Sequence, residues 1–270
     1  MERIGLIAGN GRFPLLFAQG ARNRSVHVTA VAHVGETLPE LGEVVDKIFW
    51  IRVGQLGKLI KIFKEEGVRD VVMAGGIKKT RLFTEAWPDF RSLTLLAKIK
   101  EKKDDALLRA VAEELEREGI TVRESTLYLE SMLVKKGPLT ARHPTPREWE
   151  DIRFGWGLAR EIGRLDIGQC LVIKDQVVLA VEAIEGTDET IERAGRLGRE
   201  GTVVIKICKP NQDFRFDIPA VGLQTLQSME KVGASVLALE VGRSILLDKE
   251  ESLSLADRLG IAIVGVEGLG

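Results

Sequence analysis

The sequence predicts an α/β fold made of two small domains joined by a proline-rich linker, and three observations support this. The chain is rich in aliphatic residues and glycine but poor in aromatic residues, with 28 glycines in 270 residues. Short apolar strand patterns alternate with helical patterns, as in sheets covered by helices. The alternation stops once, at 135–146 (KKGPLTARHPTP), where three prolines and a glycine interrupt any period. We therefore expect domains at 1–134 and 147–270, with 135–146 as the linker.

The N-terminal half alternates strands and helices in the order that favours a parallel, Rossmann-like sheet. Apolar strands are predicted at 3–9, 26–32, 47–53 and 70–76, and a further one closes this half. Helices are expected between them, after Pro14, at 54–67 and at 104–119. The last of these opens with acidic residues, which suit the positive end of a helix.

The C-terminal half restarts the alternation and adds a hairpin, which favours a mixed sheet. We expect a helix at 148–163 and then a hairpin that turns around 174–176. A helix capped by Thr187 or Asp188 follows, and after it a strand at 202–208 and a helix at 223–233. A strand, a strand-to-helix unit and a final strand complete the chain.

Charge and composition exclude several classes of protein. Lysine and arginine (39) nearly balance aspartate and glutamate (40), so a nucleic-acid partner is not expected. Cys170 and Cys208 lie far apart, which favours two reduced, buried thiols. No apolar run approaches the roughly 20 residues that span a bilayer, and the first strand begins at once, without a signal peptide. We expect a cytoplasmic protein, at most peripheral to a membrane.

Glycine-rich turns follow two of the predicted strands, in GLIAGNGRFP and MAGGIKK. Two such turns on one parallel sheet face the same edge, where the backbone can approach a phosphate. The residues concerned are Gly9, Asn10, Gly11, Gly75 and Gly76. Pro14 occupies the third glycine position of the dinucleotide fingerprint, and the second strand ends near His33 rather than an acid, which disfavours NAD. A purely structural role for these turns is the alternative.

The segment KICKPNQDFRFDIPAVG places charges of both signs directly after a buried strand. Its cations are suited to a diphosphate and its carboxylates to Mg²⁺; they are Lys206, Lys209, Arg215, Asp213 and Asp217. Zinc chemistry and covalent serine or cysteine catalysis lack their motifs here. The pattern therefore favours metal-assisted attack of water on phosphorus. A solvated surface loop is the plainer alternative.

Charged residues also interrupt two apolar strands of the C-terminal half. Glu182 lies inside one strand and Lys206 inside another, so we expect them to meet each other or a charged ligand. The alternative is that Glu182 faces solvent on a half-exposed sheet. Asp104, in the first turn of its helix, either caps that helix or binds a hydroxyl group or a metal ion.

Several of these motifs together resemble a known family, the UDP-2,3-diacylglucosamine pyrophosphatases of the LpxI type, which act in lipid A synthesis in Gram-negative bacteria. The most specific blocks are EAIEGTDE and KPNQDFRFDIP, and the match runs from the first strand to the last. The resemblance implies Mg²⁺-dependent hydrolysis of UDP-2,3-diacylglucosamine to 2,3-diacylglucosamine 1-phosphate (lipid X) and UMP. It also implies that one aspartate of QDFRFD is essential, Asp213 before Asp217.

We accordingly expect catalytic roles for Asp213, Asp217, Lys206 and Arg215, with the two aspartates as metal ligands. The expected substrate-binding residues are Gly9, Asn10, Gly11, Gly75, Gly76, Asp104, Glu182, Gly186, Thr187, Asp188, Lys209 and Gln212. The competing hypotheses are a regulatory module that binds a UDP-sugar without turnover and, less favoured, a nicotinamide-dependent oxidoreductase.

A lipid substrate also requires an apolar surface for its acyl chains. The segment 82–99 offers Trp87 and Phe90, for acyl chains or for peripheral contact with the inner membrane, with ordinary packing of a helix on the sheet as the alternative. A homodimer is a further expectation.

Overall fold

The structure is a computed structural model that describes residues 2–77, 87–98, 104–216 and 218–269. The chain divides into two compact units. The N-terminal unit contains the residues up to Glu130 and a short return of the chain that begins at Asp213. The C-terminal unit contains Ser131–Gln212 and the residues from Ile218 onward.

The N-terminal unit is built on five parallel strands in the order β3-β2-β1-β4-β5. The strands are β1 (Arg3–Ala8), β2 (His27–His33), β3 (Lys47–Ile51), β4 (Asp70–Ala74) and β5 (Thr121–Arg123). Its helices are α1 (Phe13–Asn23), α2 (Leu56–Glu65), α4 (Phe90–Lys98) and α5 (Asp104–Arg117), with a 3₁₀ turn at Pro39–Glu43. Strand order and direction confirm the predicted Rossmann-like sheet.

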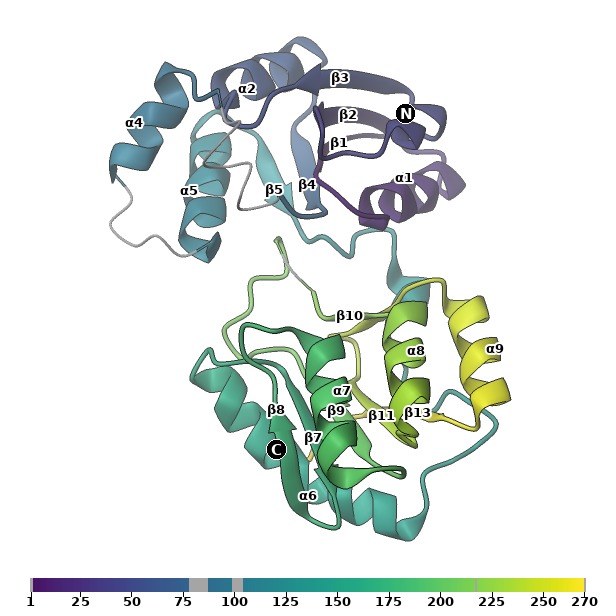
Figure 1. Ribbon diagram of the computed structural model, residues 1–270. Coiled ribbons are helices and arrows are strands. Elements are labelled where there is room, and N and C mark those ends of the chain that lie inside the picture. The colour runs from purple at the N-terminus through teal and green to yellow at the C-terminus, as the bar shows by residue number, and fades with distance from the viewer. Residues whose placement is uncertain (1, 78–86, 99–103, 217, 270) are drawn as a thin grey trace. The chain divides into compact units, whose positions relative to one another are not determined.

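Helices cover both faces of this sheet (Figure 1). One face packs against α1, where Phe17 is fully buried. The other face packs against α2, α4 and α5. Leu59 and Phe63, whose helical spacing predicts α2, are both buried on this second face. The predicted apolar stripe of α2 is therefore confirmed as the side that faces the core.

The C-terminal unit contains a six-stranded mixed sheet in the order β6-β13-β11-β9-β7-β8. The strands are β6 (Gly137–Pro138), β7 (Cys170–Lys174), β8 (Val177–Val181), β9 (Val203–Lys206), β11 (Val236–Glu240) and β13 (Ala262–Val266). A small parallel pair, β10 (Ala220–Val221) and β12 (Ile245–Leu246), lies apart from it. The antiparallel pairing of β7 with β8 and the parallel pairing of β9, β11 and β13 confirm the hairpin and the mixed sheet.

The helices that cover this second sheet are α6 (Pro146–Arg164), α7 (Thr187–Gly198), α8 (Leu223–Val232) and α9 (Lys249–Leu259). Helix α6 packs on one face through Trp156, which is 1% exposed. Helices α7, α8 and α9 pack on the other (Figure 1). The sequence therefore places a hydrophobic layer on each side of β9, the strand that leads into the charged segment.

The proline-rich segment 135–146 packs within the C-terminal unit. Gly137 and Pro138 pair with β13 in antiparallel fashion. At its end, Thr145 and Glu148 form a capping box that starts α6. The segment is thus held by backbone pairing on one side and by a helix cap on the other.

Candidate active site

The charged segment begins where the chain leaves β9. The main-chain N–H of Cys208 donates to Glu240 Oε2 at 2.9 Å, and Arg160 Nη2 donates to Glu240 Oε1 at 2.9 Å. Glu240 ends β11 and is 5% exposed, so it is a buried carboxylate; besides Arg160, the Nε of Arg243 lies 3.8 Å from its Oε1. Sequence reasoning missed this residue, although an acid closing the apolar stretch VLALE was a usable signal.

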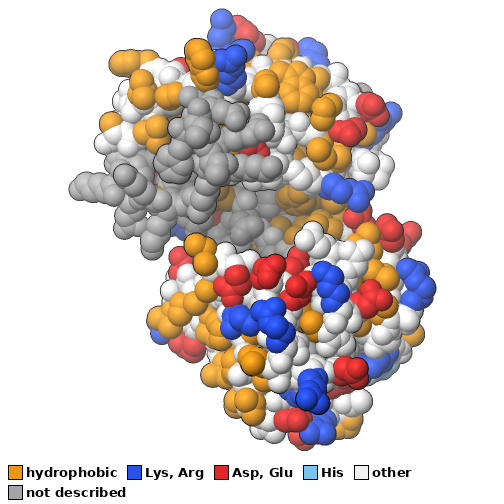
Figure 2. All heavy atoms as spheres, in the orientation of Figure 1, with side chains coloured by type: hydrophobic (Ala, Val, Ile, Leu, Met, Phe, Trp, Pro, Cys, Tyr) orange, Lys and Arg blue, Asp and Glu red, His pale blue; other side chains and the backbone are white. Residues whose placement is uncertain are grey.

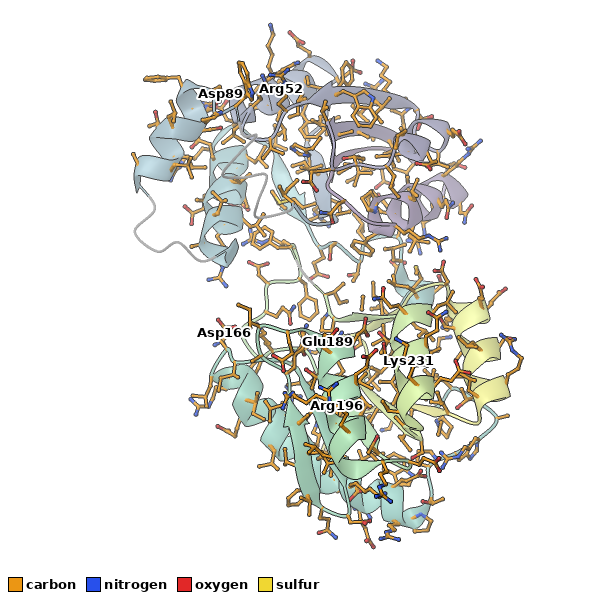
Figure 3. The ribbon with its side chains drawn as sticks, in the orientation of Figure 1. Arg52, Asp89, Asp166, Glu189, Arg196 and Lys231 are labelled. Atoms are coloured by element: carbon orange, nitrogen blue, oxygen red, sulfur yellow. The ribbon has the colours of Figure 1, made fainter. Side chains whose placement is uncertain are left out.

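The next turn is closed by Gln212. Its Oε1 accepts from the N–H of Lys209 at 3.1 Å, and its own N–H donates to the Lys209 carbonyl at 3.0 Å. Lys209 Nζ pairs with Asp166 at 2.8 Å, just beyond the end of α6 (Figure 3). In this conformation Lys209 and Gln212, both expected to bind substrate, stabilise the turn.

The residues that follow, Asp213 to Phe216, pack within the N-terminal unit. Ser125, just beyond β5, donates both its N–H and its hydroxyl to the Phe214 carbonyl, each at 2.9 Å. Phe216 packs against the core under α2, α4 and α5. Asp213 is thereby held at the carboxyl end of the parallel sheet, the edge where such sheets bind ligands.

Asp213 forms a two-point ion pair with Arg215. Asp213 Oδ1 accepts from Arg215 Nε at 3.0 Å, and Oδ2 accepts from Nη2 at 2.8 Å. Arg215 also donates to Glu116 at 3.1 Å, and Arg109 Nε lies 3.9 Å from Asp213 Oδ2. Arg109 and Glu116, both on α5, are site residues that sequence reasoning did not find.

The ion pair controls the protonation of Asp213. The hydrogen bond from Arg215 holds the pKa of this carboxyl below its usual range, and Arg109 adds a smaller effect in the same direction. Asp213 is therefore ionised throughout the neutral range. A carboxylate offers about four lone-pair positions, of which Arg215 uses three: two through its side chain and one through its main-chain N–H, which donates to Asp213 Oδ1 at 3.2 Å. The residue consequently fits as a single protein ligand for Mg²⁺, which commonly binds one or two carboxylates together with substrate phosphates.

The glycine turns of β1 and β4 lie together, as their placement on neighbouring strands requires. The N–H of Asn10 donates to the Gly76 carbonyl at 2.7 Å. A Cβ atom on Gly9 would lie 2.3 Å from that same carbonyl oxygen, and one on Gly75 would lie 2.3 Å from the Asn10 carbonyl oxygen. Because the two backbones approach each other this closely, positions 9 and 75 require glycine. Gly11, with φ +79° and open space around it, has no such packing role.

Polar side chains lie beside these turns. Asn10 Nδ2 donates to Glu36 at 2.8 Å, and His33 Nδ1 donates to the Ala8 carbonyl at 2.9 Å. Both Glu36 and His33 are buried. Burial lowers the pKa of His33, so its ring is neutral at neutral pH.

In the C-terminal unit, a hydroxyl group links the two charges that were expected to meet. Lys206 Nζ donates to Thr187 Oγ1 at 3.0 Å, and Thr187 Oγ1 donates to Glu182 Oε1 at 3.0 Å. Lys206 also donates to the Ala220 carbonyl at 2.9 Å, and Lys206 and Glu182 are both buried. Gly186, with φ +86°, is the N-cap residue that lets the chain enter α7 here.

Three of the expected residues remain: Asp188, Asp104 and Asp217. Asp188 lies in the first turn of α7, where it is partly exposed. Asp104 begins α5, but its side chain lies outside the described part of the structure, as does Asp217. Within the ranges that the structure describes, no three His, Cys, Asp or Glu side chains gather in the way of a preformed metal site.

The fold and these sites define a class of protein: two α/β units that carry charged side chains at the carboxyl ends of parallel strands, where such folds bind ligands. Two family models match almost the whole chain, the LpxI N-terminal domain at residues 3–132 and the LpxI C-terminal domain at residues 135–264. The chain belongs to the LpxI family. This confirms the resemblance carried by its motifs.

A curated relative supports the same assignment. The chain is 34% identical over 280 residues to UDP-2,3-diacylglucosamine pyrophosphatase LpxI of Caulobacter vibrioides, covering 99% of this chain and 98% of the relative.

The chain is also distantly similar to solved structures. The biotin carboxylase subunit of pyruvate carboxylase is 15% identical with a TM-score of 0.28, covering 67% of this chain and 36% of that one. An ADP complex of N5-carboxyaminoimidazole ribonucleotide synthetase is 14% identical with a TM-score of 0.28, covering 72% of this chain and 44% of that one. Similarity at this level carries no argument about function.

Proposed function

We propose that the protein hydrolyses the pyrophosphate bond of UDP-2,3-diacylglucosamine to give 2,3-diacylglucosamine 1-phosphate (lipid X) and UMP, a step of lipid A biosynthesis. The observation that carries this proposal is the 34% identity to a pyrophosphatase of that name over 99% of the chain. The match includes both halves of the protein, so the reaction and its substrate are proposed for the whole chain.

Asp213 is the residue to which we assign the essential role, and its electrostatics limit what that role is. A carboxylate whose pKa lies below its usual range is a weak base, so removing a proton from water is not its main contribution. Its negative charge instead holds cations in place at the diphosphate. Arg215 and Arg109, which contact it, are the groups that would bind phosphate oxygens, since guanidinium groups match phosphate geometry.

Mg²⁺ is part of this proposal, with Asp213 as its protein ligand and Asp217 as the second expected one. When bound, the ion offsets the charge that develops on the phosphate oxygens during attack by water. The chain's own residues bind and orient the diphosphate. They also hold the carboxylate in its ionised form.

Lys206 is a further cation assigned to the reaction, besides Arg215 and Arg109. Two of its three N–H donors are used, by Thr187 and by the Ala220 carbonyl, and the third has no partner among the residues that the structure describes. A buried ammonium group with one free donor is suited to a phosphate oxygen. Glu182, through the hydroxyl of Thr187, orients this group.

Product analysis tests the proposed function. The purified chain is incubated with UDP-2,3-diacylglucosamine, and UMP is separated by chromatography, with and without EDTA. Asp213→Asn is expected to lower kcat by at least about 100-fold with substrate still bound, the order expected for losing one preorganised electrostatic group. Asp175→Asn, which alters an exposed aspartate paired with Arg147, is the matched control and should retain activity.

Each outcome of this assay distinguishes between the hypotheses. Binding of substrate without any UMP would favour the regulatory module over the enzyme. UMP release at an unchanged rate by Asp213→Asn would remove Asp213 from the site. Reaction in ¹⁸O-labelled water would show which monoester takes the label and so which phosphorus is attacked.

We also propose that the protein is cytoplasmic and contacts the inner membrane peripherally through α4. Trp87 and Phe90 are 62% and 86% exposed, and hydrophobic side chains lie over α4 in Figure 2. Leu95 is buried on the opposite face, so packing on the sheet explains only part of the apolar character of this helix. No helix in the described ranges has the length and apolar character needed to cross a membrane.

Flotation with vesicles of anionic phospholipid tests this contact. The Arg52 guanidinium lies 4.5 Å from the centre of the Trp87 ring, where it could reach a lipid phosphate (Figure 3). Trp87→Ser with Phe90→Ser should abolish flotation and raise KM for the lipid substrate. Flotation unchanged by these substitutions would exclude α4 as the contact.

A further inference from the structure

Helix α5 presents a row of charged side chains on one side. Arg109, Glu113 and Glu116 follow one another at intervals of four and three residues, which places them on one face of the helix. A different face of α5 packs into the core through Ala112 and Leu115, which are fully buried. The row of charges is therefore carried by an element whose position is fixed, and Glu116, with its side chain 45% exposed, remains accessible to solvent.

Glu116 and Asp213 share one guanidinium group, that of Arg215. The Nε and Nη2 of Arg215 donate to the two oxygens of Asp213, and Nη1 donates to Glu116 Oε1 at 3.1 Å. The guanidinium carbon also lies 5.0 Å from the centre of the Phe216 ring. A guanidinium group has five N–H donors, of which three are used here, so two have no acceptor among the residues that the structure describes. One cation is thus held by two carboxylates and keeps donors for a further ligand.

Asp213 has little capacity left for another ligand in this arrangement. The main-chain N–H of Arg215 also donates to Asp213 Oδ1, at 3.2 Å, and Arg109 Nε lies 3.9 Å from Oδ2. About one lone-pair position of the carboxylate is left, with two guanidinium groups nearby. Positive charges at such distances oppose the approach of a divalent cation. Full use of Asp213 as a metal ligand therefore requires that the Arg215 side chain release it.

Glu116 is placed to hold Arg215 after such a release. It bonds a different nitrogen of the guanidinium group from those that Asp213 bonds, so its hydrogen bond survives when the other two break. The main chain beside Arg215 does not have to move, because Ser125 fixes the Phe214 carbonyl. Stability gives no comparable reason for Glu116, since a pair as exposed as this one adds little to the free energy of folding.

We propose that Glu116 is a positioning residue for the reaction assigned to this chain: it keeps the Arg215 guanidinium at the diphosphate once Arg215 has released Asp213 to the metal ion. The inference rests on the proposed function. While Arg215 is paired with Asp213, its charge is already balanced and the bond to Glu116 adds little. After the release, Glu116 is the described carboxylate still bonded to Arg215, so Glu116 stabilises the metal-bound arrangement more than the free one. The unused donors of Arg215 then bind phosphate oxygens.

Binding of Mn²⁺ in place of Mg²⁺, measured by electron paramagnetic resonance without substrate, tests this exchange. Arg215→Met should bind Mn²⁺ at least about tenfold more tightly than the wild-type chain, because it removes a positive charge and two hydrogen bonds from Asp213. Glu116→Gln should bind Mn²⁺ about threefold more weakly, the size of effect that one exposed charge pair gives. In the Arg215→Met background, adding Glu116→Gln should change the affinity by less than about twofold, because the group through which Glu116 acts is absent.

Glu113→Gln is the matched control. It removes the same charge from the same face of α5, and the Glu113 carboxylate is also close enough to raise the pKa of Arg215, but its ion pair is with Arg117. Its effect on Mn²⁺ binding should stay below about twofold. In the UMP assay, Glu116→Gln should lower kcat by about tenfold, a part of the loss expected when a whole preorganised donor is removed, whereas Glu113→Gln should retain the rate. The thermal midpoints of both variants should equal that of the wild-type chain.

The outcomes distinguish a positioning role from an ordinary surface ion pair. Equal Mn²⁺ affinities and rates for Glu116→Gln and Glu113→Gln would overturn the proposal. An equal loss of affinity from Glu116→Gln with and without Arg215 would also overturn it, because Glu116 would then act on the ion directly. So would a lack of tighter Mn²⁺ binding by Arg215→Met, shown to be folded by circular dichroism, or by Arg215→Gln if the first variant does not fold. A wild-type chain that binds Mn²⁺ as expected but releases no UMP would refute the proposed function and leave the exchange at Asp213 in place.

Discussion

Removing the Glu240 carboxylate should destabilise the C-terminal unit at the point where the chain leaves β9. Glu240→Ala leaves Arg160 without its carboxylate and leaves the buried N–H of Cys208 without its acceptor. Breaking a buried ion pair costs about 3–5 kcal/mol. Arg160 is 34% exposed and can turn toward water, which places the pair at or below the low end of that range.

The expected total is therefore about 3 kcal/mol, of which the unsatisfied N–H contributes about 1 kcal/mol or more. At about 2–4 °C per kcal/mol, the thermal midpoint should fall by about 6–12 °C. Urea unfolding followed by tryptophan emission, to which Trp156 contributes from the core of this unit, measures the change.

The control is Glu161→Ala on the same helix as Arg160. Glu161 is 64% exposed and paired with Arg164, so its loss should cost less than about 0.5 kcal/mol. The double variant Arg160→Met with Glu240→Gln should lose less free energy of unfolding than the two single variants lose together, because it removes both charges of the pair and leaves neither of them unpaired. A loss below about 1 kcal/mol for Glu240→Ala would show that this carboxylate does not fix the chain.

Three other predictions concern Gly9, His33 and Thr187. Gly9→Ala should destabilise the N-terminal unit by about 3 kcal/mol or more, because its Cβ would overlap the Gly76 carbonyl. Gly11→Ala, in open space, should cost only about 1 kcal/mol. The midpoints of urea unfolding of the two variants measure this difference. Burial lowers the pKa of His33, so below pH 6.5 the unfolded state binds a proton more readily than the folded state does. The free energy of unfolding should therefore be at its full value above pH 6.5 and fall as the pH decreases below it. His33→Gln should flatten this dependence between pH 7.5 and 5.5. Thr187→Val should lower kcat by about tenfold or more by breaking the link from Lys206 to Glu182, while Thr187→Ser should retain the rate; equal rates in the two variants would contradict a role for the hydroxyl.

The elements of the fold could be predicted because their signals are local. The spacing of Leu59 and Phe63 predicts the buried stripe of α2, and Lys174 to Gln176 mark the turn of a hairpin. Glycine after β1 and β4 predicts two turns at one edge, because parallel strands share a direction. The reason for glycine at position 9 could not be predicted, since it is contact with a second turn more than 60 residues away.

The candidate site could be predicted only in part, because its partners are far apart in the sequence. The apolar context of Glu182 and Lys206 predicts that they meet. The sequence around Thr187 predicts a helix cap equally well, so it does not show that the Thr187 hydroxyl bridges the two charges. Glu240 and Arg160 are separated by 80 residues, and no period relates an acid closing a strand to an arginine on a helix.

Main-chain groups on each side of Asp213 are held by residues of the unit to which each group belongs. The N–H of Cys208 is held by Glu240, and the carbonyl of Phe214 is held by Ser125. Main-chain contacts of this kind do not depend on which side chains the segment carries, so the path alone does not require Asp213 to be charged. An aspartate is nevertheless present, ionised and bound by an arginine two residues away. That charge is best explained by a ligand, and the carboxyl end of a parallel sheet is the place where a charged ligand is expected.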